Sequence, residues 1–194
     1  MSPTETWKNF YQATRESPPS ALLVEAMEFV RNKGTALDVG CGALKDSRFL
    51  VHEGFDVVAI DAEPAVANEI HDIPADRFHF TQTTFEDFSY DVEKFDCINA
   101  MYSLPFIAPH AFNDVFRAIT SALKHDGIFC GVFFGNNDEW NANPDMTFHT
   151  KADVEASFSD MEVLAFKEKE FDGTTALKTP KHWHTFQVIA RRKS

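Results

Sequence analysis

The sequence has little of three things: cysteine, positive charge and long apolar runs. It contains three cysteines, Cys41, Cys97 and Cys130, and no two of them form a C-x-x-C pair. An odd, scattered set argues against a disulfide framework or a zinc site, so we expect three reduced, buried thiols and no bound metal. No apolar stretch approaches the roughly 18 residues that cross a bilayer, and residues 1–6 lack the basic and apolar regions of a signal peptide. These absences predict a cytoplasmic protein without membrane contact.

Positive charge is scarce, because 30 acidic residues oppose 18 lysines and arginines and the formal net charge is -12. Nucleic-acid binding relies on clustered Lys and Arg, and the only basic run is Arg191-Arg-Lys193. We therefore expect a small-molecule substrate and no nucleic-acid partner. With 194 residues, 44% hydrophobic and 20 of them phenylalanine, the chain can bury the core of a single domain over residues 1–194. A monomer and a homodimer are both compatible with the sequence.

The stretch from Ala36 to Leu50 predicts a strand, a glycine turn and a helix. Gly40 and Gly42 fall in the turn, where a glycine lets the backbone come close to a ligand. A second apolar strand over 55–60 ends at Asp61, 21 residues after Gly40 (61 minus 40). A carboxylate about 20 residues after such a turn is placed to accept the two hydroxyls of an adenosine ribose.

A nicotinamide site would require a third glycine where this chain has Lys45. The turn Asp38-Val-Gly40-Cys-Gly42 instead resembles the D-x-G-x-G motif of class I S-adenosylmethionine-dependent methyltransferases. The resemblance continues over most of the chain: Phe95–Phe106 is similar to the fourth strand of that family and its following loop, and Leu123–Phe134 to the turn into its fifth strand. One departure is Leu44, where many members carry a further glycine.

Three further segments resemble a narrower group, the small bacterial methyltransferases of the tellurite-resistance and thiopurine-methyltransferase type. They are the aromatic segment Trp7–Tyr11, the Pro18-Pro19 pair and Lys181–His184. This resemblance implies that residues 1–33 form an N-terminal helical cap segment on the methyltransferase domain.

The family resemblance implies S-adenosyl-L-methionine as the cofactor. It assigns Asp61 to the ribose, Phe85 to the adenine and the end of the fourth strand to the methionine half. An acidic residue often contacts the adenine amino group in the family, but here that place falls on Thr84 and Phe85. The implied cofactor-binding residues are Asp38, Gly40, Cys41, Gly42, Asp61, Ala62, Thr84, Phe85, Asn99, Ala100 and Met101.

The apolar patterning alternates strands and helices along the chain. We expect helices over 4–16, 20–33, 44–53, 64–70, 109–124 and 150–158, and strands over 35–39, 56–60, 78–82, 95–100, 127–134, 161–171 and 182–192. Strict alternation predicts a parallel sheet, and the last two strands, without a helix between them, predict an antiparallel hairpin at one edge. The expected fold is therefore α/β, a Rossmann-like three-layer sandwich with a seven-stranded, mostly parallel sheet.

The sequence does not identify a catalytic base. Transfer to an oxygen or ammonium acceptor requires one, whereas a thiolate, selenium or tellurium nucleophile does not. The candidate catalytic residues are His149, His182, His184 and Tyr11, with Asp138 and Glu139 as further possible bases. His182 and His184 lie two apart on a predicted strand, so they share a face and Trp183 points the other way.

Several residues have a functional and a structural interpretation. Trp7, Phe10 and Tyr11 could cover the cofactor's sulfonium or simply pack an N-terminal helix. Arg15 could pair with the cofactor carboxylate or be exposed, and Phe106 and Trp140 could wall a substrate pocket or pack the core. The function implied is methyl transfer to a small molecule, with a sulfur, selenium or tellurium compound as one acceptor class. The alternative is a non-catalytic S-adenosylmethionine-binding sensor or partner protein.

Overall fold

The computed structural model describes residues 3–193, so residues 1, 2 and 194 of the predicted domain lie outside the described part. Its seven strands form one sheet in the order β3-β2-β1-β4-β5-β7-β6. The strands are β1 (Thr35–Val39), β2 (Asp56–Asp61), β3 (Phe78–Gln82), β4 (Phe95–Ala100), β5 (Leu123–Phe134), β6 (Met161–Thr174) and β7 (Pro180–Arg192). Strands β1 to β5 pair in parallel, while β7 is antiparallel to both β5 and β6. The predicted fold class, including the antiparallel hairpin, is confirmed.

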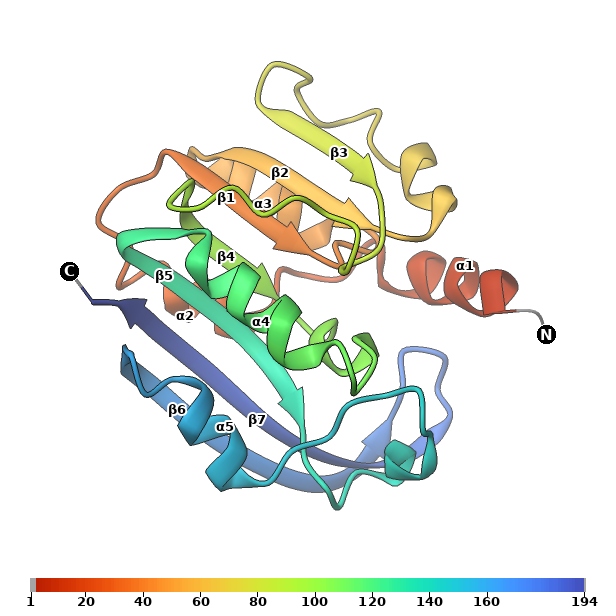
Figure 1. Cartoon of the computed structure of the whole chain (residues 1–194). Coiled ribbons are helices and arrows are strands. Elements are labelled where there is room, and N and C mark those ends of the chain that lie inside the picture. The colour runs from red at the N-terminus through yellow and green to blue at the C-terminus, as the bar shows by residue number, and fades with distance from the viewer. Residues whose placement is uncertain (1–2, 194) are drawn as a thin grey trace.

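Helices cover both faces of the sheet, with α4 and α5 on one face and α2 and α3 on the other (Figure 1). The helix α1 lies beside the carboxyl ends of the parallel strands. The helices are α1 (Pro3–Thr14), α2 (Ala21–Ala26), α3 (Lys45–Glu53), α4 (Phe112–Ser121) and α5 (Lys151–Ser157), and three short 3-10 turns are η1 (Pro64–Asn68), η2 (Leu104–Phe106) and η3 (Glu139–Ala142).

The core has two halves because successive strand residues point to opposite faces. Ala36 belongs to the cluster that packs α2 and α3, whereas its neighbour Leu37 belongs to the cluster that packs α4 and α5. Both residues are fully buried, as expected for a strand covered by helices on both faces. This packing fixes the strand ends, and with them the loops that follow β1, β2, β3 and β4.

Three predicted helices differ from the observed elements. The helix expected over 109–124 is the shorter α4, because β5 already begins at Leu123. The helix expected over 20–33 ends at Ala26, because Glu28 and Phe29 donate to carbonyls only three residues back and the chain tightens into a turn. Ser20 does not cap this helix with its side chain; its hydroxyl instead donates to Asp46 Oδ2 at 2.7 Å. The helix expected over 64–70 is the 3-10 turn η1, which begins at a proline.

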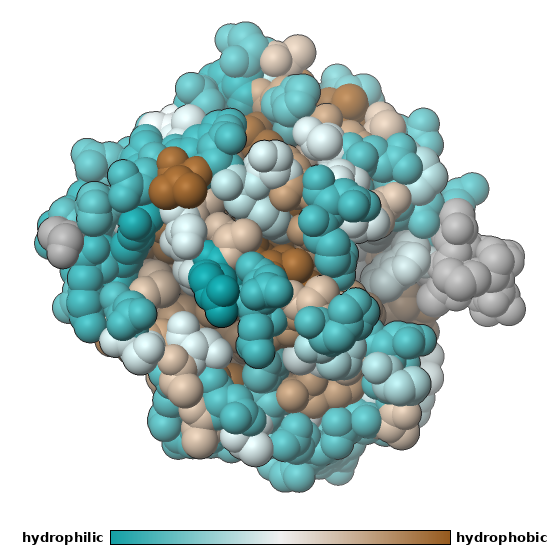
Figure 2. Space-filling model, in the orientation of Figure 1, coloured by the Kyte–Doolittle hydropathy of each residue, from teal (hydrophilic) through white to brown (hydrophobic). Residues whose placement is uncertain are grey.

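The face of the molecule seen in Figure 2 is mostly hydrophilic, with apolar side chains in small separate patches. No helix among residues 3–193 is long and apolar enough to cross a membrane.

Candidate active site

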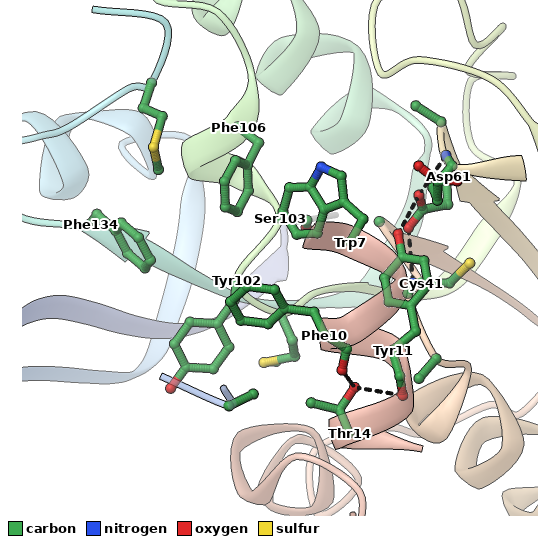
Figure 3. A pocket seen from close by; sticks show the side chains of 18 of the residues that line it. Trp7, Phe10, Tyr11, Thr14, Cys41, Asp61, Tyr102, Ser103, Phe106 and Phe134 are labelled. Carbon is green, nitrogen blue, oxygen red and sulfur yellow. Dashed lines mark hydrogen bonds between the residues drawn. The ribbon is translucent and has the colours of Figure 1, made fainter. Parts of the chain in front are cut away.

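A cavity of about 1260 Å³ lies at the carboxyl ends of the parallel strands. Its wall is built from α1, the β1–α3 turn, the ends of β2 and β5, the loops after β3 and β4, η3, and the β6–β7 hairpin. Figure 3 shows aromatic side chains of α1 and of the later loops facing this space. In a parallel sheet this edge, beside the point where the strand order reverses, is where ligands bind. Here the order reverses between β1 and β4.

The glycine turn after β1 is tight. Gly40 and Gly42 have φ angles of 71° and 50°, and the amides of Gly40 and Cys41 donate to Ile60 O at 2.9 and 3.0 Å. Leu44, which replaces the family's further glycine, also has a left-handed φ of 61° and is fully buried. The turn therefore keeps a glycine-like backbone at a leucine, and burial of the leucine side chain offsets the strain.

Asp61 at the end of β2 is the carboxylate predicted for a ribose. Its Oδ2 accepts from the Gly42 amide at 2.9 Å, and its Oδ1 accepts from the Glu63 amide and the Tyr11 hydroxyl, both at 3.0 Å. The three contacts tie Asp61 to the glycine turn and to α1 (Figure 3). Burial, together with the charge of Asp61, raises the pKa of Tyr11 far above its usual range. Tyr11 is thus a hydrogen-bond donor here, which makes it unsuited to act as a base near neutral pH.

Asp38 in β1 is buried beneath the turn. Its carboxylate accepts from Ser47 Oγ at 2.6 Å and from Asn99 Nδ2 at 2.8 Å. Burial is the main cause that raises the pKa of Asp38 to about 7, and the nearby Asp46 adds to it. Burial likewise raises the pKa of the Cys41 thiol, with contributions from Asp38 and Asp61, so this cysteine is a neutral group in the cavity wall.

The other predicted cofactor residues divide into two groups. Ala62, Thr84, Phe85 and Met101 line the cavity, whereas Asn99 and Ala100 are buried in the sheet and are not part of its lining. Asn99 instead holds the Asp38 carboxylate, and Ala100 packs against the α4 side of the core. Their inward direction follows from the sheet, since β4 is covered on both faces.

The half of the cavity near η3 is walled by aromatic rings. Phe106 makes an edge contact with Trp7, with centroids 5.0 Å apart, and lies 6.5 Å from Trp140. Trp140 in turn lies 5.9 Å from Trp183 and 6.1 Å from Phe134. These contacts join α1, the β4 loop, η3 and β7 into one apolar wall. The interpretation of Phe106 and Trp140 as pocket residues agrees with this geometry, as does their packing role.

A buried ion pair lies behind that wall. Lys181 Nζ contacts Asp138 Oδ1, and the two side chains are 1% and 0% exposed. The ammonium also lies 3.8 Å from the Trp183 centroid and 4.4 Å from that of Trp140. Asp138 further accepts from the amides of Trp140 and His184, at 3.0 and 3.2 Å. A carboxylate engaged in this way and shielded from the cavity cannot serve as the base suggested by the sequence.

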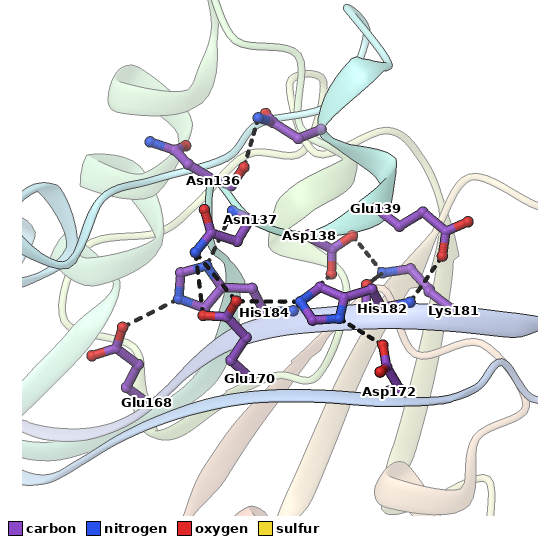
Figure 4. A network of polar contacts seen from close by, with 11 residues as sticks. Asn136, Asn137, Asp138, Glu139, Glu168, Glu170, Asp172, Lys181, His182 and His184 are labelled. Carbon is purple, nitrogen blue, oxygen red and sulfur yellow. Dashed lines mark hydrogen bonds and ion pairs between the residues drawn. The ribbon is translucent and has the colours of Figure 1, made fainter.

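The two histidines of β7 do not line the cavity, while Trp183 between them does. This agrees with the predicted opposite orientation of Trp183. Figure 4 shows the polar contacts of both imidazole rings. His182 contacts Asp172 Oδ1 at 2.7 Å and Glu170 Oε1 at 3.3 Å, and these acidic partners raise its pKa. His184 Nδ1 accepts from the Asn137 amide at 3.1 Å and its Nε2 contacts Glu168 at 3.2 Å. The His182 ring is thus held by acidic residues of β6, whereas the His184 ring is buried between β6, the segment after β5 and Phe186.

His149 also lies outside the main cavity. It lines a separate hollow of about 550 Å³ and packs against Phe112, with ring centroids 4.5 Å apart. Burial lowers its pKa. None of the three predicted histidines therefore contributes to the large cavity, whose described lining contains no imidazole.

Two basic residues, Arg15 and Lys45, lie elsewhere relative to the cavity than the sequence suggested. Arg15 pairs with Glu69 at 3.3 Å and does not line the cavity. From this position it does not reach a cofactor carboxylate in the cavity, which was one of its two interpretations. Lys45, at the start of α3, is the one basic residue among the described residues that line the cavity. Its Nζ lies 2.7 Å from Ser20 Oγ and 3.2 Å from Asp46 Oδ1. Sequence reasoning considered Lys45 only as a missing glycine.

Sequence reasoning also missed other polar residues of the lining, among them Ser103, Glu63, Glu86 and Thr14. Of these, only Glu86 could have been predicted from the sequence, because it follows Phe85, the residue assigned to the adenine. Glu139, named as a possible base, does line the cavity, and its Oε2 accepts from the His182 amide at 2.8 Å. Among the side chains described, no group of three or more His, Cys, Asp or Glu is placed to hold a metal ion.

Residues 36–127 match a family model described as a methyltransferase domain. The match begins in β1 and includes the glycine turn, Asp61 and the β4 loop. The matched segment supplies the glycine turn, Asp61 and the loop after β4 to the cavity wall, and the match agrees with S-adenosylmethionine as the cofactor.

Several solved structures have the same fold, and S-adenosylmethionine-dependent methyltransferases are among them. TehB from Haemophilus influenzae has a TM-score of 0.79 and 15% identity, over 95% of this chain and 66% of that one. A Methanosarcina mazei SAM-dependent methyltransferase has a TM-score of 0.66 and 18% identity, over 86% and 96% of the two chains. The Burkholderia thailandensis 1,6-didemethyltoxoflavin-N1-methyltransferase, solved with 1,6-didemethyltoxoflavin and S-adenosylhomocysteine, has a TM-score of 0.65 and 16% identity, over 98% and 87%. A comparison with curated protein sequences gives no significant match.

Proposed function

We propose that this protein is an S-adenosylmethionine-dependent methyltransferase whose acceptor is a small molecule. The observation that carries the proposal is the joint position of the glycine turn and Asp61. The Gly42 amide donates to Asp61 Oδ2 at 2.9 Å, so turn and carboxylate form one unit on the cavity wall. Such a unit at the strand switch point suits an adenosine ribose.

The residues present fit the cofactor. Each carboxylate oxygen offers about two acceptor sites, and Asp61 Oδ2 has used only one of them, leaving room for a ribose hydroxyl. Phe85 would flank the adenine, and Ala62 would lie near it. Lys45 would pair with the cofactor carboxylate, which is a role that Arg15 does not fill from its ion pair with Glu69.

The aromatic half of the cavity suits the acceptor. S-adenosylmethionine, when bound, supplies a methyl group with a very good leaving group, so the chain chiefly has to orient the reactants and exclude water. The aromatic wall would do both. The lining described contains no histidine, which favours acceptors whose nucleophilic atom needs no base, such as a thiolate or a selenium or tellurium compound. That acceptor class also agrees with the tellurite-resistance and thiopurine resemblance.

The first test is the effect of Asp61→Ala on binding of S-adenosylhomocysteine, measured by calorimetry. We expect a loss of about 1 to 3 kcal/mol, the usual cost of removing charge-assisted hydrogen bonds. Glu162→Ala is a matched control, because Glu162 pairs with Arg191 on the exposed face of the hairpin. Equal affinity of wild type and Asp61→Ala would refute the ribose assignment.

Turnover is tested separately with a panel of oxygen, amine, thiol, selenite and tellurite acceptors. The readout is formation of S-adenosylhomocysteine. Product with a thiol or chalcogen acceptor would support the base-free chemistry proposed above. Tight cofactor binding without product from any acceptor would favour the alternative function, a non-catalytic binder. The observation behind that alternative is that the described cavity lining contains no histidine.

A further inference from the structure

His184 makes three hydrogen bonds to the segment between β5 and η3. The ladder that joins β5 to β7 ends where β5 ends. Beyond it, the Gly135 amide donates to His184 O at 2.7 Å, and the His184 amide donates to Asp138 Oδ2 at 3.2 Å. The third bond involves the imidazole, because the Asn137 amide donates to Nδ1 at 3.1 Å (Figure 4). Of the three, only this last bond depends on the protonation state of a ring.

The glycine at position 135 gives the imidazole its place. Gly135 has no left-handed φ, so its backbone conformation does not require a glycine. A Cβ at this position would instead overlap the His184 ring. The ring is enclosed on its other side by Phe186, with centroids 4.9 Å apart, and His184 is 7% exposed. The absent side chain thus lets the imidazole reach the Asn137 amide.

The hydrogen bonds fix the protonation state of the ring. An amide can only donate, so Nδ1 of His184 carries no proton while it accepts from Asn137. The proton of the neutral ring lies on Nε2, which donates to Glu168 Oε1 at 3.2 Å. A second proton would turn Nδ1 into a donor and break the bond to Asn137, whereas the bond to Glu168 would remain.

The surroundings favour a charge on this ring. Carboxylates of β6 lie beside it, and they would stabilise an imidazolium although the ring is buried. The charged or titratable groups that face the ring from the elements around it are Glu168 and Glu170 of β6, Asp138 before η3, His182 of β7, and the two lysines that pair with these acids, Lys151 and Lys181.

We infer that His184 is a positioning residue that makes one half of the cavity wall sensitive to pH. The segment it holds leads into η3, where Asp138 accepts from the Trp140 amide at 3.0 Å and Trp140 lines the cavity. The neutral ring fixes this segment, and the protonated ring loosens it. That this half receives the acceptor rests on the proposed function.

The first test follows Trp140 by fluorine NMR in protein labelled with 5-fluorotryptophan. The chain has three tryptophans, Trp7, Trp140 and Trp183, which all line the cavity, and substitution of each by phenylalanine assigns its signal. We expect the Trp140 signal of wild type to move between about pH 8 and about pH 5, where imidazoles take up a proton. In His184→Asn the signal should stay constant, because the amide oxygen can replace Nδ1 as acceptor and does not titrate.

The matched control is His182→Asn, the same substitution on the same face of the same strand. The His182 ring contacts Glu170 and Asp172, so its loss should leave the wild-type response of Trp140 intact. A Trp140 signal of wild type that does not depend on pH would overturn the inference. A response that persists in His184→Asn, or that disappears in His182→Asn, would also overturn it.

Hydrogen exchange of the Asn137 amide measures the bond itself. At about pH 8 this amide should exchange about two- to tenfold faster in His184→Leu than in wild type, the effect of one hydrogen bond, and at the wild-type rate in His184→Asn. Equal rates in His184→Leu and wild type would contradict the role of the ring. Both measurements use ligand-free protein, so a negative result leaves the proposed function standing. Failure of wild type to bind S-adenosylhomocysteine would instead contradict that function and not the pH response.

Discussion

At the scale of single residues, the site is organised by the hydrogen bonds of Asp61. Its two oxygens offer about four acceptor sites, and Gly42, Glu63 and Tyr11 occupy three of them. The two hydroxyls of a ribose require two acceptor sites. One of the three present donors must therefore leave, and Tyr11 is the only one that is a side chain. The sequence suggested Tyr11 as a catalytic residue or part of a lid, whereas its hydroxyl occupies an acceptor site that the proposed ligand would need.

Tyr11→Phe should therefore tighten binding of S-adenosylhomocysteine by about 0.5 to 1.5 kcal/mol, the net value of one hydrogen bond that no longer has to be broken. Calorimetry on the two proteins measures this. In the Asp61→Asn background the same substitution should have a much smaller effect, since the two residues act through one contact. Weaker binding by Tyr11→Phe in the wild-type background would show that the phenol contacts the ligand directly.

At the scale of secondary-structure elements, Asp138 and Lys181 join η3 to β7. They are 43 residues apart in sequence and meet because β5 and β7 pair side by side. Asp138 caps η3 through the Trp140 amide and also binds the His184 amide. The pair thus sets the position of Trp140 and Trp183, two rings of the cavity wall.

Removing one partner should be costly, since it leaves the other charge buried alone. We expect Asp138→Asn and Lys181→Met each to lower the free energy of unfolding by about 3 to 5 kcal/mol, measured by urea denaturation. The double variant should lose clearly less than the sum of the two. Additive losses would show that the ion pair itself contributes little.

At the scale of the whole molecule, stability depends on pH through groups buried by the fold. Asp38 has a folded pKa of about 7 against an ordinary 3.8, with Asp46 and Lys45 as its charged neighbours. The folded state then binds more protons than the unfolded state between these two values, so this group lowers stability as pH rises from about 4 to 7. His182 acts in the same direction and buried His149 in the opposite one.

The variant Asp38→Asn isolates the contribution of Asp38 to this pH dependence of stability. The free energy of unfolding of the variant minus that of wild type should increase as pH rises from about 4 to about 7 and become constant above that. Chemical denaturation at a series of pH values measures the difference, in which the contributions of His149 and His182 cancel. Parallel stability profiles for the two proteins would show that Asp38 is charged throughout this range.

Local patterns in the sequence were sufficient to predict the fold class and to nominate the glycine turn and Asp61 as a cofactor site. Apolar alternation and the helix-breaking residues are local signals, so all seven strands and the β-hairpin could be predicted from them. The spacing from Gly40 to Asp61 is also local, because one strand–helix–strand unit separates a turn from the next strand end. The resemblance to methyltransferases could be read from the sequence for this reason, and the match of residues 36–127 to a methyltransferase-domain model agrees with it. The tellurite-resistance and thiopurine subgroup stays a prediction.

Which polar side chains reach the cavity depends on the packing of elements that are distant in sequence. Asn99 and Ser103 lie four residues apart, yet one supports Asp38 inside the sheet and the other lines the cavity. The histidines of β7 had the right chemistry for a base, but the pairing of β7 with β5 and β6 places both on the face of the strand opposite to Trp183, outside the cavity lining. Orientation of this kind depends on which elements pack on each side of a strand, and those contacts come from distant parts of the chain.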